Sequence, residues 1–427
     1  MLEKYFSLSA NNTSVRTEVL AGVTTFLTMA YIIFVNPAIL ANAGMDKNAV
    51  FVATCLAAAI ASVMMGVIAN YPIALAPGMG LNAYFAFTVA PKFGWEAALG
   101  AVFVSGVIFF ILSVLPVREW IINAIPKSLK LAISAGIGLF LGIIGLQACG
   151  FVVDHPATLV THGDFTKWSV ILAGVGFAIM IALDHHKVPG GLIIGVLTVT
   201  VIAMILGLQK FGGITSAPPS IMPVFLKLDI GAALSIGLVT VVFAFLFVDL
   251  FDNSGTLIGI AHRAGFLRPD GTVPRLGQAL TVDSSAAMIG ALLGTSTTTS
   301  YIESAAGIKA GGRTGLTAVV VGILFVLALF FAPLAGSVPA FATAPALIYV
   351  ACLMAKGLTE IDWEDATEYA PAVLTALTMP FTYSIADGIA VGFIAYAVIK
   401  VASGRAREVS PVIGILAVLF VLKYAFV

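Results

Sequence analysis

Residues 294–313 read Gly-Thr-Ser-Thr-Thr-Thr-Ser-Tyr-Ile-Glu-Ser-Ala-Ala-Gly-Ile-Lys-Ala-Gly-Gly-Arg, a polar stretch with apolar segments on both sides. Five of its first six residues are Ser or Thr, which favour extended or capped backbone, whereas the part from Tyr301 to Gly307 can begin a short helix. We therefore expect a strand that runs into a half-helix, with Glu303 at the N-terminus of the half-helix. At membrane depth such backbone survives only where protein or a water-filled cavity satisfies its polar groups.

The composition indicates a polytopic membrane protein. Of the 427 residues, 60% are hydrophobic and 10% are charged, whereas about a quarter are charged in soluble domains. The formal net charge is zero, so nothing suggests a nucleic-acid partner. No polar region is long enough to fold separately, and we expect residues 1–427 to form one membrane domain. Cys55, Cys149 and Cys352 stand singly in apolar segments and are interpreted as small hydrophobic residues.

Fourteen apolar segments are expected to cross the bilayer, seven in each half of the chain. In the first half they are 18–40, 49–70, a short one at 77–90, 97–116, 129–150, 168–184 and 189–207. In the second half they are 232–261, 279–293, a short one at 300–310, 314–333, 339–355, 367–382 and 384–402. A last apolar run, 411–427, is either a further span or a helix along the membrane edge.

The two halves share one layout, in which the third segment is short and begins with a Pro-rich or Gly/Thr-rich stretch. Broken segments in matching positions of two repeats indicate a transporter site at the repeat interface. Seven spans per repeat place the halves in opposite orientations. With a cytoplasmic N-terminus, 15 of the 21 Lys and Arg residues fall on inside segments and five outside, as the positive-inside rule requires. We therefore expect a multi-pass protein with a cytoplasmic N-terminus.

Two carboxylates within apolar segments are the candidates for proton coupling. An ionised carboxylate at mid-bilayer costs about 2.5–3.5 kcal/mol on insertion scales, so Asp252 is retained either for function or for a structural cap or helix contact. Asp249, three residues earlier, is more easily explained as structural. At Glu303 the helix dipole would lower the pKa of the carboxyl group, whereas burial would raise it. Such a balance suits a site that takes up and releases a proton.

The broken third segment supplies the other side of the expected site. Pro77, Gly78 and Gly80 interrupt the span, and Asn82 offers both a donor and an acceptor. The ring of Phe85 could stack on a planar ligand, which is worth about 1–3 kcal/mol for a base, although most membrane Phe residues simply pack. The candidate substrate-binding residues are Glu303, Asp252, Asn82, Gly80, Phe85, Thr295, Ser296, Tyr301 and Thr28. For Thr28 the alternative is a hydroxyl bonded to its own helix.

Four motifs resemble the nucleobase cation symporter-2 family, and within it the AzgA-like hypoxanthine, adenine and guanine permeases. They are residues 16–31, 76–85, 250–259, and 300–307 together with 311–318. The resemblance covers almost the whole chain and implies an all-α membrane fold of two inverted seven-segment repeats. It implies a core domain at about 16–116 and 232–333, a gate domain at about 127–207 and 339–402, and short strands before segments 3 and 10 with the substrate between them.

Residue by residue, the resemblance puts the segment-8 carboxylate at Asp252 and the segment-10 carboxylate at Glu303. It implies that Gly80 and Asn82 shape the segment-3 side. Relatives that carry uracil or xanthine have a Glu-His pair where this chain has Asp252-Asn253, which argues against those substrates. The form of the segment-3 motif, Ala-Pro-Gly-Met-Gly-Leu-Asn, resembles the hypoxanthine/guanine carriers more than the adenine carriers.

The resemblance implies a secondary active transporter, not an enzyme, that imports purine nucleobases by proton symport. Hypoxanthine and guanine are the first candidates, adenine stays open, and alternating access is elevator-like or rocking. The expected partners are the purine, the proton and the lipid of a cell (inner or plasma) membrane, with a homodimer left open; no cofactor or metal is expected. The alternatives are an anion transporter of the same fold, a passive nucleobase facilitator, and an intramembrane enzyme with Asp252 and Glu303 as an acid/base pair.

Overall fold

The computed structural model describes residues 2–114, 125–234, 236–263 and 274–426, although several side chains in 236–263 and at the C-terminus lie outside the described set. The chain divides into two compact units. Unit 1 comprises Met1–Val114 and Gly145–Ala346, and unit 2 comprises Leu115–Ile144 and Leu347–Val427. The expected core and gate boundaries stay a prediction.

Helices dominate the structure, and nine described ones are long and apolar enough to cross a membrane. They are Val15–Ala41 (α2, Val15–Met29, with α3, Ile32–Ala41), Lys47–Ala69 (α4, Lys47–Met64, with a π-helical turn), α7 (Trp95–Val114), α9 (Lys127–Ala148), α10 (Trp168–His185), α14 (Leu276–Leu293), Gly315–Gly336 (α16, Gly315–Ala328, with α17, Ala332–Gly336), Ala340–Glu360 (α18, Ala340–Ala355, with a 3₁₀ turn) and α20 (Ile385–Ala402). The expectation of an all-α polytopic membrane protein is confirmed, and the count of fourteen spans stays a prediction.

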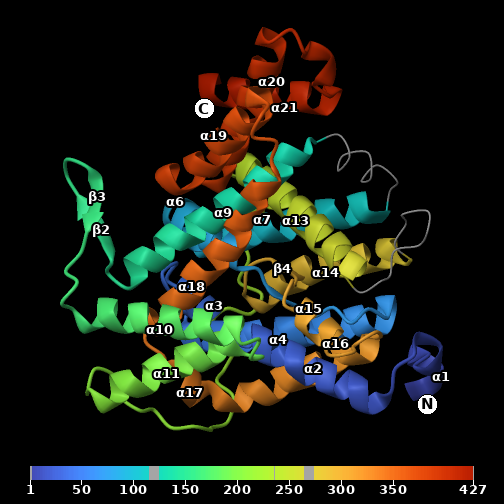
Figure 1. The fold of residues 1–427 in the computed structure, drawn as a ribbon, viewed down its shortest axis with the longest axis vertical. Coiled ribbons are helices and arrows are strands. Elements are labelled where there is room, and N and C mark those ends of the chain that lie inside the picture. Colours follow the sequence, from blue (N-terminus) through green and yellow to red (C-terminus); the bar gives the residue numbers. More distant parts are fainter. Residues whose placement is uncertain (1, 115–124, 235, 264–273, 427) are drawn as a thin grey trace. The chain divides into compact units, whose positions relative to one another are not determined.

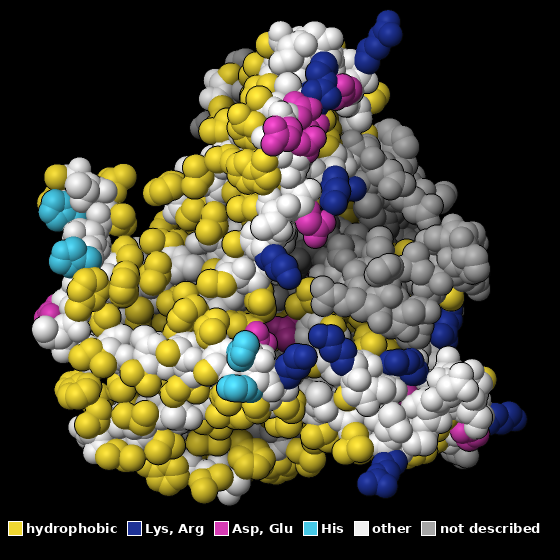
Figure 2. Space-filling view, in the orientation of Figure 1, with side chains coloured by type: hydrophobic (Ala, Val, Ile, Leu, Met, Phe, Trp, Pro, Cys, Tyr) yellow, Lys and Arg dark blue, Asp and Glu magenta, His cyan; other side chains and the backbone are white. Residues whose placement is uncertain are grey.

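Further helices occupy other expected segments, and α13 is the longest of them at 28 residues. They are α11 (Gly191–Ile205), α12 (Ile230–Ala233), α13 (Ile236–Arg263), α19 (Ala366–Thr382) and α21 (Pro411–Phe426), with α1 (Leu2–Phe6) at the N-terminus. The 16 residues of α21 extend about 24 Å, less than the hydrocarbon thickness of about 30 Å. In unit 1, hydrophobic side chains cover the surface over α10 and α11 (Figures 1 and 2), as expected of helices that face lipid.

Side-chain caps fix where several helices begin. Ser14 accepts a hydrogen bond from the Thr17 N–H at the start of α2, and Asp46 accepts one from the Ala49 N–H at the start of α4. Thr314, Asp365 and Ser384 act likewise at α16, α19 and α20. Each such cap satisfies one of the backbone donors that a helix leaves unpaired at its N-terminus.

Two short strands pair inside unit 1, and the place where they pair is called the strand crossing below. Strand β1 (Leu75–Pro77) pairs antiparallel with β4 (Thr298–Ser300), in the register Leu75 with Ser300 and Pro77 with Thr298. The Gly78 N–H donates to the Thr297 carbonyl at 2.9 Å, and the Tyr301 N–H donates to the Ala74 carbonyl at 2.9 Å. Both strands are fully buried, so the expected strands before segments 3 and 10 are confirmed.

A second antiparallel pair, β2 (Val152–His155) and β3 (Leu159–His162), forms a hairpin between α9 and α10 (Figure 1). Its side chains are mostly exposed. Residues 151–167 lie between two expected spans, and the structure adds this hairpin there.

Glycines allow helices of unit 1 to pack closely. In α16, a Cβ atom on Gly322 would lie 2.6 Å from Val63 Cγ2 and 2.8 Å from the Ala59 carbonyl oxygen of α4. Helix α16 therefore lies directly against α4, as small residues permit in membranes, and it also lies beside α2 (Figure 1).

Replacing Gly322 with Ala should destabilise the protein, because the added methyl group overlaps α4. Overpacking of this kind costs about 1–3 kcal/mol, and we expect the apparent melting temperature in detergent to fall by several degrees. A Cβ atom added to Gly174 in α10 would have no atom of the described residues within 4 Å. Gly174→Ala is therefore the matched control and should leave the melting temperature unchanged or raise it. Equal melting temperatures for the two variants would contradict the packing analysis.

In unit 2, a network of charges joins the start of α19 to the end of α20. Lys400 has a fully buried side chain that lies 2.6 Å from Glu368 Oε1 and 2.7 Å from Glu408 Oε2. Arg405 contacts Glu408 Oε1 at 2.6 Å and Asp365 Oδ2 at 2.5 Å. Hydrogen bonding from Arg405, with help from Thr367, lowers the pKa of Asp365. The stability that this bond adds is therefore present above the ordinary carboxyl pKa of about 3.9 and is lost as the pH falls through the lowered folded-state pKa.

Lys400→Met should destabilise the protein far more than Lys127→Met. Lys400 is buried between two carboxylates, whereas Lys127 and Glu360 form a pair at 3.1 Å whose side chains are 71% and 60% exposed. Breaking a buried pair costs about 3–5 kcal/mol, and we expect less here because Glu408 is 42% exposed; an exposed pair contributes about 0–1 kcal/mol. Thermal unfolding of both variants measures the difference, and equal losses would contradict it.

Candidate functional site

Each of the two paired strands leads into a short helical segment that is too short to cross the membrane. Strand β1 leads through Gly78 into α5 (Met79–Tyr84), which continues as a π-helical turn and the short α6 (Ala90–Phe93). Strand β4 leads into α15 (Ser304–Lys309), with Glu303 at its N-terminus. Because the strands are antiparallel, the two short helices leave the strand pair at opposite ends. The Tyr301 hydroxyl donates to the Pro77 carbonyl at 2.6 Å and thereby ties the ends together.

Glu303 is held by a buried tyrosine. The Tyr31 hydroxyl donates to Glu303 Oε1 at 2.7 Å, and Tyr31 is fully buried whereas Glu303 is half-buried. The Glu303 backbone carbonyl lies 3.5 Å from the Thr28 hydroxyl. That hydroxyl lies closer, at 2.8 Å, to the Thr25 carbonyl of its own helix, so backbone bonding is its shorter interaction. The carboxylate is thus oriented by a buried donor, and Glu303 as a residue is half-buried.

Three of the predicted site residues belong to one buried polar network. Asn82 donates through Nδ2 to Asn36 Oδ1, and its Oδ1 accepts a hydrogen bond from the Ser296 hydroxyl. Asn36 Nδ2 in turn donates to the Thr295 hydroxyl at 2.9 Å and to the Thr54 hydroxyl at 2.7 Å. The structure therefore brings Asn82, Thr295 and Ser296 together in one network. Here they bind other protein groups, and direct contact with a substrate stays a prediction.

The segment-8 candidates lie in α13. The side chain of Asp252 lies outside the described residues, so its predicted role stays a prediction. Asp249 is buried and accepts a hydrogen bond from Asn253 Nδ2 at 2.9 Å. The Oδ1 atom of Asn253 is buried and has no hydrogen-bond partner within the described part of the chain. The side-chain amide of Asn253 therefore holds the Asp249 carboxylate one helical turn away.

The remaining predicted residues differ in exposure. Gly80 is half-buried in the first turn of α5, whereas Phe85 and Tyr301 are buried. The Phe85 ring has no exposed face, so stacking on a ligand would require this ring to become accessible. Gly78, Gly80 and Glu303, which follow the two strands, are each half-buried.

Sequence reasoning missed two buried carboxylates of unit 1, one beside the strand crossing and one at the far end of the segment that begins with Glu303. Asp283 of α14 is fully buried, and its Oδ1 accepts a hydrogen bond from the Ser300 hydroxyl of β4 at 2.7 Å. Glu18 of α2 is fully buried as well. An ionisable residue inside an apolar segment is itself a signal of function, and this signal would have identified Asp283. Glu18 stands near the polar end of its segment, where charges are ordinary.

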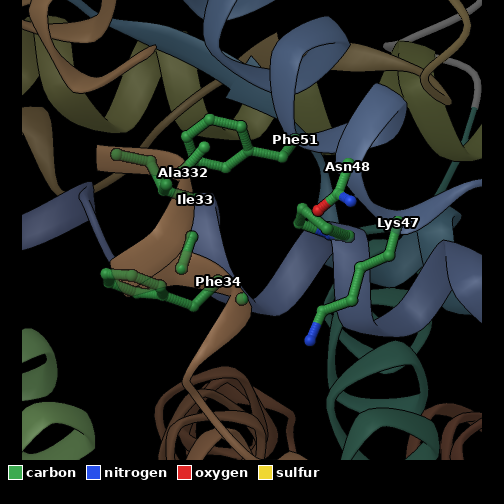
Figure 3. Close-up of a pocket in the computed structure, with 9 residues that line it drawn as sticks. Ile33, Phe34, Lys47, Asn48, Phe51 and Ala332 are labelled. Carbon is green, nitrogen blue, oxygen red and sulfur yellow. The ribbon is translucent and has the colours of Figure 1, made fainter. Parts of the chain in front are cut away.

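Two cavities of unit 1 lie away from the predicted site residues. A small one of about 10 Å³ is lined by residues of α3, α4 and α17, with Lys47 and Phe51 among them (Figure 3). An adjoining open pocket of about 340 Å³ is lined by Lys210, Ser216 and Ser337, among others. None of the predicted site residues that the structure describes lines either cavity. The candidate site is therefore defined by the broken segments and their hydrogen bonds.

Comparisons with known proteins agree with this architecture. The transmembrane domain of a cyanobacterial bicarbonate transporter, BicA, matches with a TM-score of 0.66 and 15% identity, and the match covers 89% of this chain and 97% of that structure. At this identity the likeness shows the fold alone. It confirms that the chain has the fold of a transporter membrane domain.

Sequence relatives and a family model show to which protein family the chain belongs. A model described as a permease family matches residues 16–391. Adenine permease AdeP of Escherichia coli (strain K12) is 49% identical over 429 residues, which is 100% of this chain and 96% of that protein. Guanine/hypoxanthine permease PbuG of Bacillus subtilis (strain 168) is 46% identical over 442 residues, 100% of both chains. The chain therefore belongs to this permease family, the nucleobase cation symporter-2 family, whose members are transporters and not enzymes.

Proposed function

We propose that the protein imports purine nucleobases, together with protons, across the cell (inner or plasma) membrane, with its N-terminus in the cytoplasm. The observation that carries this proposal is the placement of Glu303 at the start of α15, beside the strand crossing, with Tyr31 on one side of its carboxylate. Full-length relatives named as adenine and guanine/hypoxanthine permeases support a purine. Because their identities to this chain are similar, they do not rank adenine against hypoxanthine and guanine.

The chemistry of Glu303 suits a purine. An ionised carboxylate is an acceptor with about four lone-pair positions, and purine rings offer N–H donors at their edge. The Tyr31 hydroxyl uses one of these positions, and the half-buried carboxylate is accessible in part. The half-buried backbone at Gly78 and Gly80 lies at the start of α5, where first-turn N–H groups are available to ring nitrogens and carbonyl oxygens.

Proton coupling follows from linkage at this carboxylate. A ligand that binds Glu303 changes its affinity for a proton, and the proton changes the affinity for the ligand by the same factor. We propose that Glu303, or Asp252, takes up a proton on the outside and that alternating access, elevator-like or rocking, then exposes the loaded site to the inside. A homodimer is compatible with this scheme, which requires only one chain.

Three other functions differ from this proposal in ways that can be tested. The BicA relative is a bicarbonate transporter by name, but a site that contains Glu303, with the Asp283 carboxylate beside β4, would repel an anion. A passive facilitator would carry purine without a proton, and its uptake would not respond to a pH gradient. Purine that is recovered unmodified after uptake excludes an intramembrane enzyme.

Glu303→Gln should abolish purine uptake that is driven by a pH gradient, because the amide neither takes up a proton nor offers two acceptor atoms. A hydrogen bond to a charged group is worth about 1.5–3 kcal/mol, so we expect uptake of radiolabelled hypoxanthine, guanine or adenine into proteoliposomes to fall at least about tenfold. Glu360→Gln makes the same chemical change at an exposed residue and should leave uptake unchanged.

The rival functions give different results in the same assay. Undiminished pH-dependent uptake by Glu303→Gln would contradict the role of Glu303. Purine uptake by the wild type that ignores the pH gradient would indicate a facilitator. Uptake of bicarbonate without any purine uptake would favour the anion carrier.

A further inference from the structure

Helix α2 and the broken segment 303–313 lie antiparallel in register. At one end Tyr31, just beyond α2, donates to Glu303 Oε1 at 2.7 Å. In the middle, a Cβ atom on Gly307 would lie 2.6 Å from the Ala21 carbonyl oxygen. At the other end, Glu18 Oε1 accepts a hydrogen bond from the Arg313 N–H at 2.8 Å. The Thr28 hydroxyl also lies 3.5 Å from the Glu303 carbonyl. Residues 18 and 28 are ten apart on α2, so about 15 Å of this helix runs beside the segment from residue 303 to residue 313.

Glu18 accepts an unusual number of hydrogen bonds for one carboxylate. Besides the Arg313 N–H, its Oε2 lies 3.3 Å from the Thr314 N–H, 3.2 Å from the Thr317 N–H and 2.6 Å from the Thr317 hydroxyl. These donors form the N-terminus of α16, where a negative charge is favoured. A fully buried carboxylate is costly unless it is satisfied in this way. Glu18 thus fastens α2 to the point where the broken segment ends and α16 begins.

Arg313 extends this attachment to α15 itself. Its backbone N–H binds Glu18, while its guanidinium Nη1 donates to the Ile308 carbonyl at 2.7 Å and to the Gly312 carbonyl at 2.8 Å. The Ile308 carbonyl belongs to the last turn of α15. The C-terminal end of α15 is therefore fixed, through Arg313, to a carboxylate that lies about 15 Å along α2 from the Glu303 end.

We propose that Glu18 is a positioning residue for Glu303: it fixes the far end of the broken segment so that Glu303 meets Tyr31 and keeps its exposed surface toward the substrate. The inference rests on the proposed function. Glu18 touches neither substrate nor proton in this account, and it acts through α15. Without Glu18, α15 can slide or tilt along α2, because the fixed attachment at its C-terminal end is lost.

A double-mutant cycle tests the inference. Purine dissociation constants are measured for the wild type, Glu18→Gln, Tyr31→Phe and the double variant, on purified full-length protein with hypoxanthine, guanine and adenine. Couplings between distant sites span about 5- to 150-fold, and we expect each single variant to weaken binding about tenfold. If Glu18 acts through the Tyr31–Glu303 contact, the double variant binds about as weakly as either single one. Residues about 15 Å apart otherwise give additive effects, so an additive loss of about a hundredfold, or wild-type affinity in Glu18→Gln, overturns the proposal.

Amide hydrogen exchange provides a readout that does not depend on the substrate. Glu18→Gln should speed exchange at residues 301–308, the far end of the segment, as well as at 313–317. Asp46→Ala removes a cap of α4 in the same unit and should leave 301–308 unchanged. Faster exchange confined to 313–317 would show that Glu18 acts only as a local cap of α16, and it would overturn the proposal.

Should Glu18→Gln fail to fold, Thr317→Val removes the shortest of the four hydrogen bonds to Glu18 and should give the same pattern more weakly. If the wild type binds no purine, the proposed function fails, and the exchange pattern still decides the positioning role.

Discussion

The backbone hydrogen bonds between β1 and β4 are the constraint on which the rest of unit 1 depends. Lipid offers no partner for backbone N–H and C=O groups, so irregular backbone must be satisfied by protein. Here two three-residue strands satisfy each other and are extended on both sides by Gly78 and Tyr301. Neighbouring side chains complete the hydrogen bonding, since the Ser62 hydroxyl bonds to both the N–H and the C=O of Leu75. With its strand satisfied in this way, each broken segment can begin a short helix near the strand crossing.

Polar side chains lock this crossing from several sides. Asn82 and Ser296 join α5 to the chain that enters β4, and Asp283 holds Ser300. Ser304 accepts a hydrogen bond from the Ala74 N–H at 3.0 Å. These groups are buried and bound to one another or to backbone, which makes them rigid supports. Glu303 differs from them because it is only half-buried, and this difference makes it the candidate that meets the substrate.

The local part of this arrangement could be predicted from the sequence. The Ser/Thr run before Tyr301 predicted a strand that runs into a short helix, and the structure contains β4 with α15. The Pro-Gly stretch at residues 77 and 78 predicted an interrupted span, and the family resemblance implied a strand before it; the structure contains β1 with α5. The partners could not be predicted, because Asn36 meets Thr295, and Glu18 meets Thr317, across more than 250 residues of sequence. No local pattern encodes such a pairing. The β2–β3 hairpin was not predicted for a different reason. Each of its strands has only four residues, and polar and apolar residues alternate weakly in them.

The central claim is that Glu303 binds a purine and a proton in one site. Calorimetric titration of purified protein with hypoxanthine, guanine, adenine and uracil at two pH values, with Glu303→Gln beside the wild type, tests it most directly. The account predicts purine binding that changes with pH, is lost in the variant, and is absent for uracil. Purine binding of equal strength in the wild type and the variant at both pH values would contradict it.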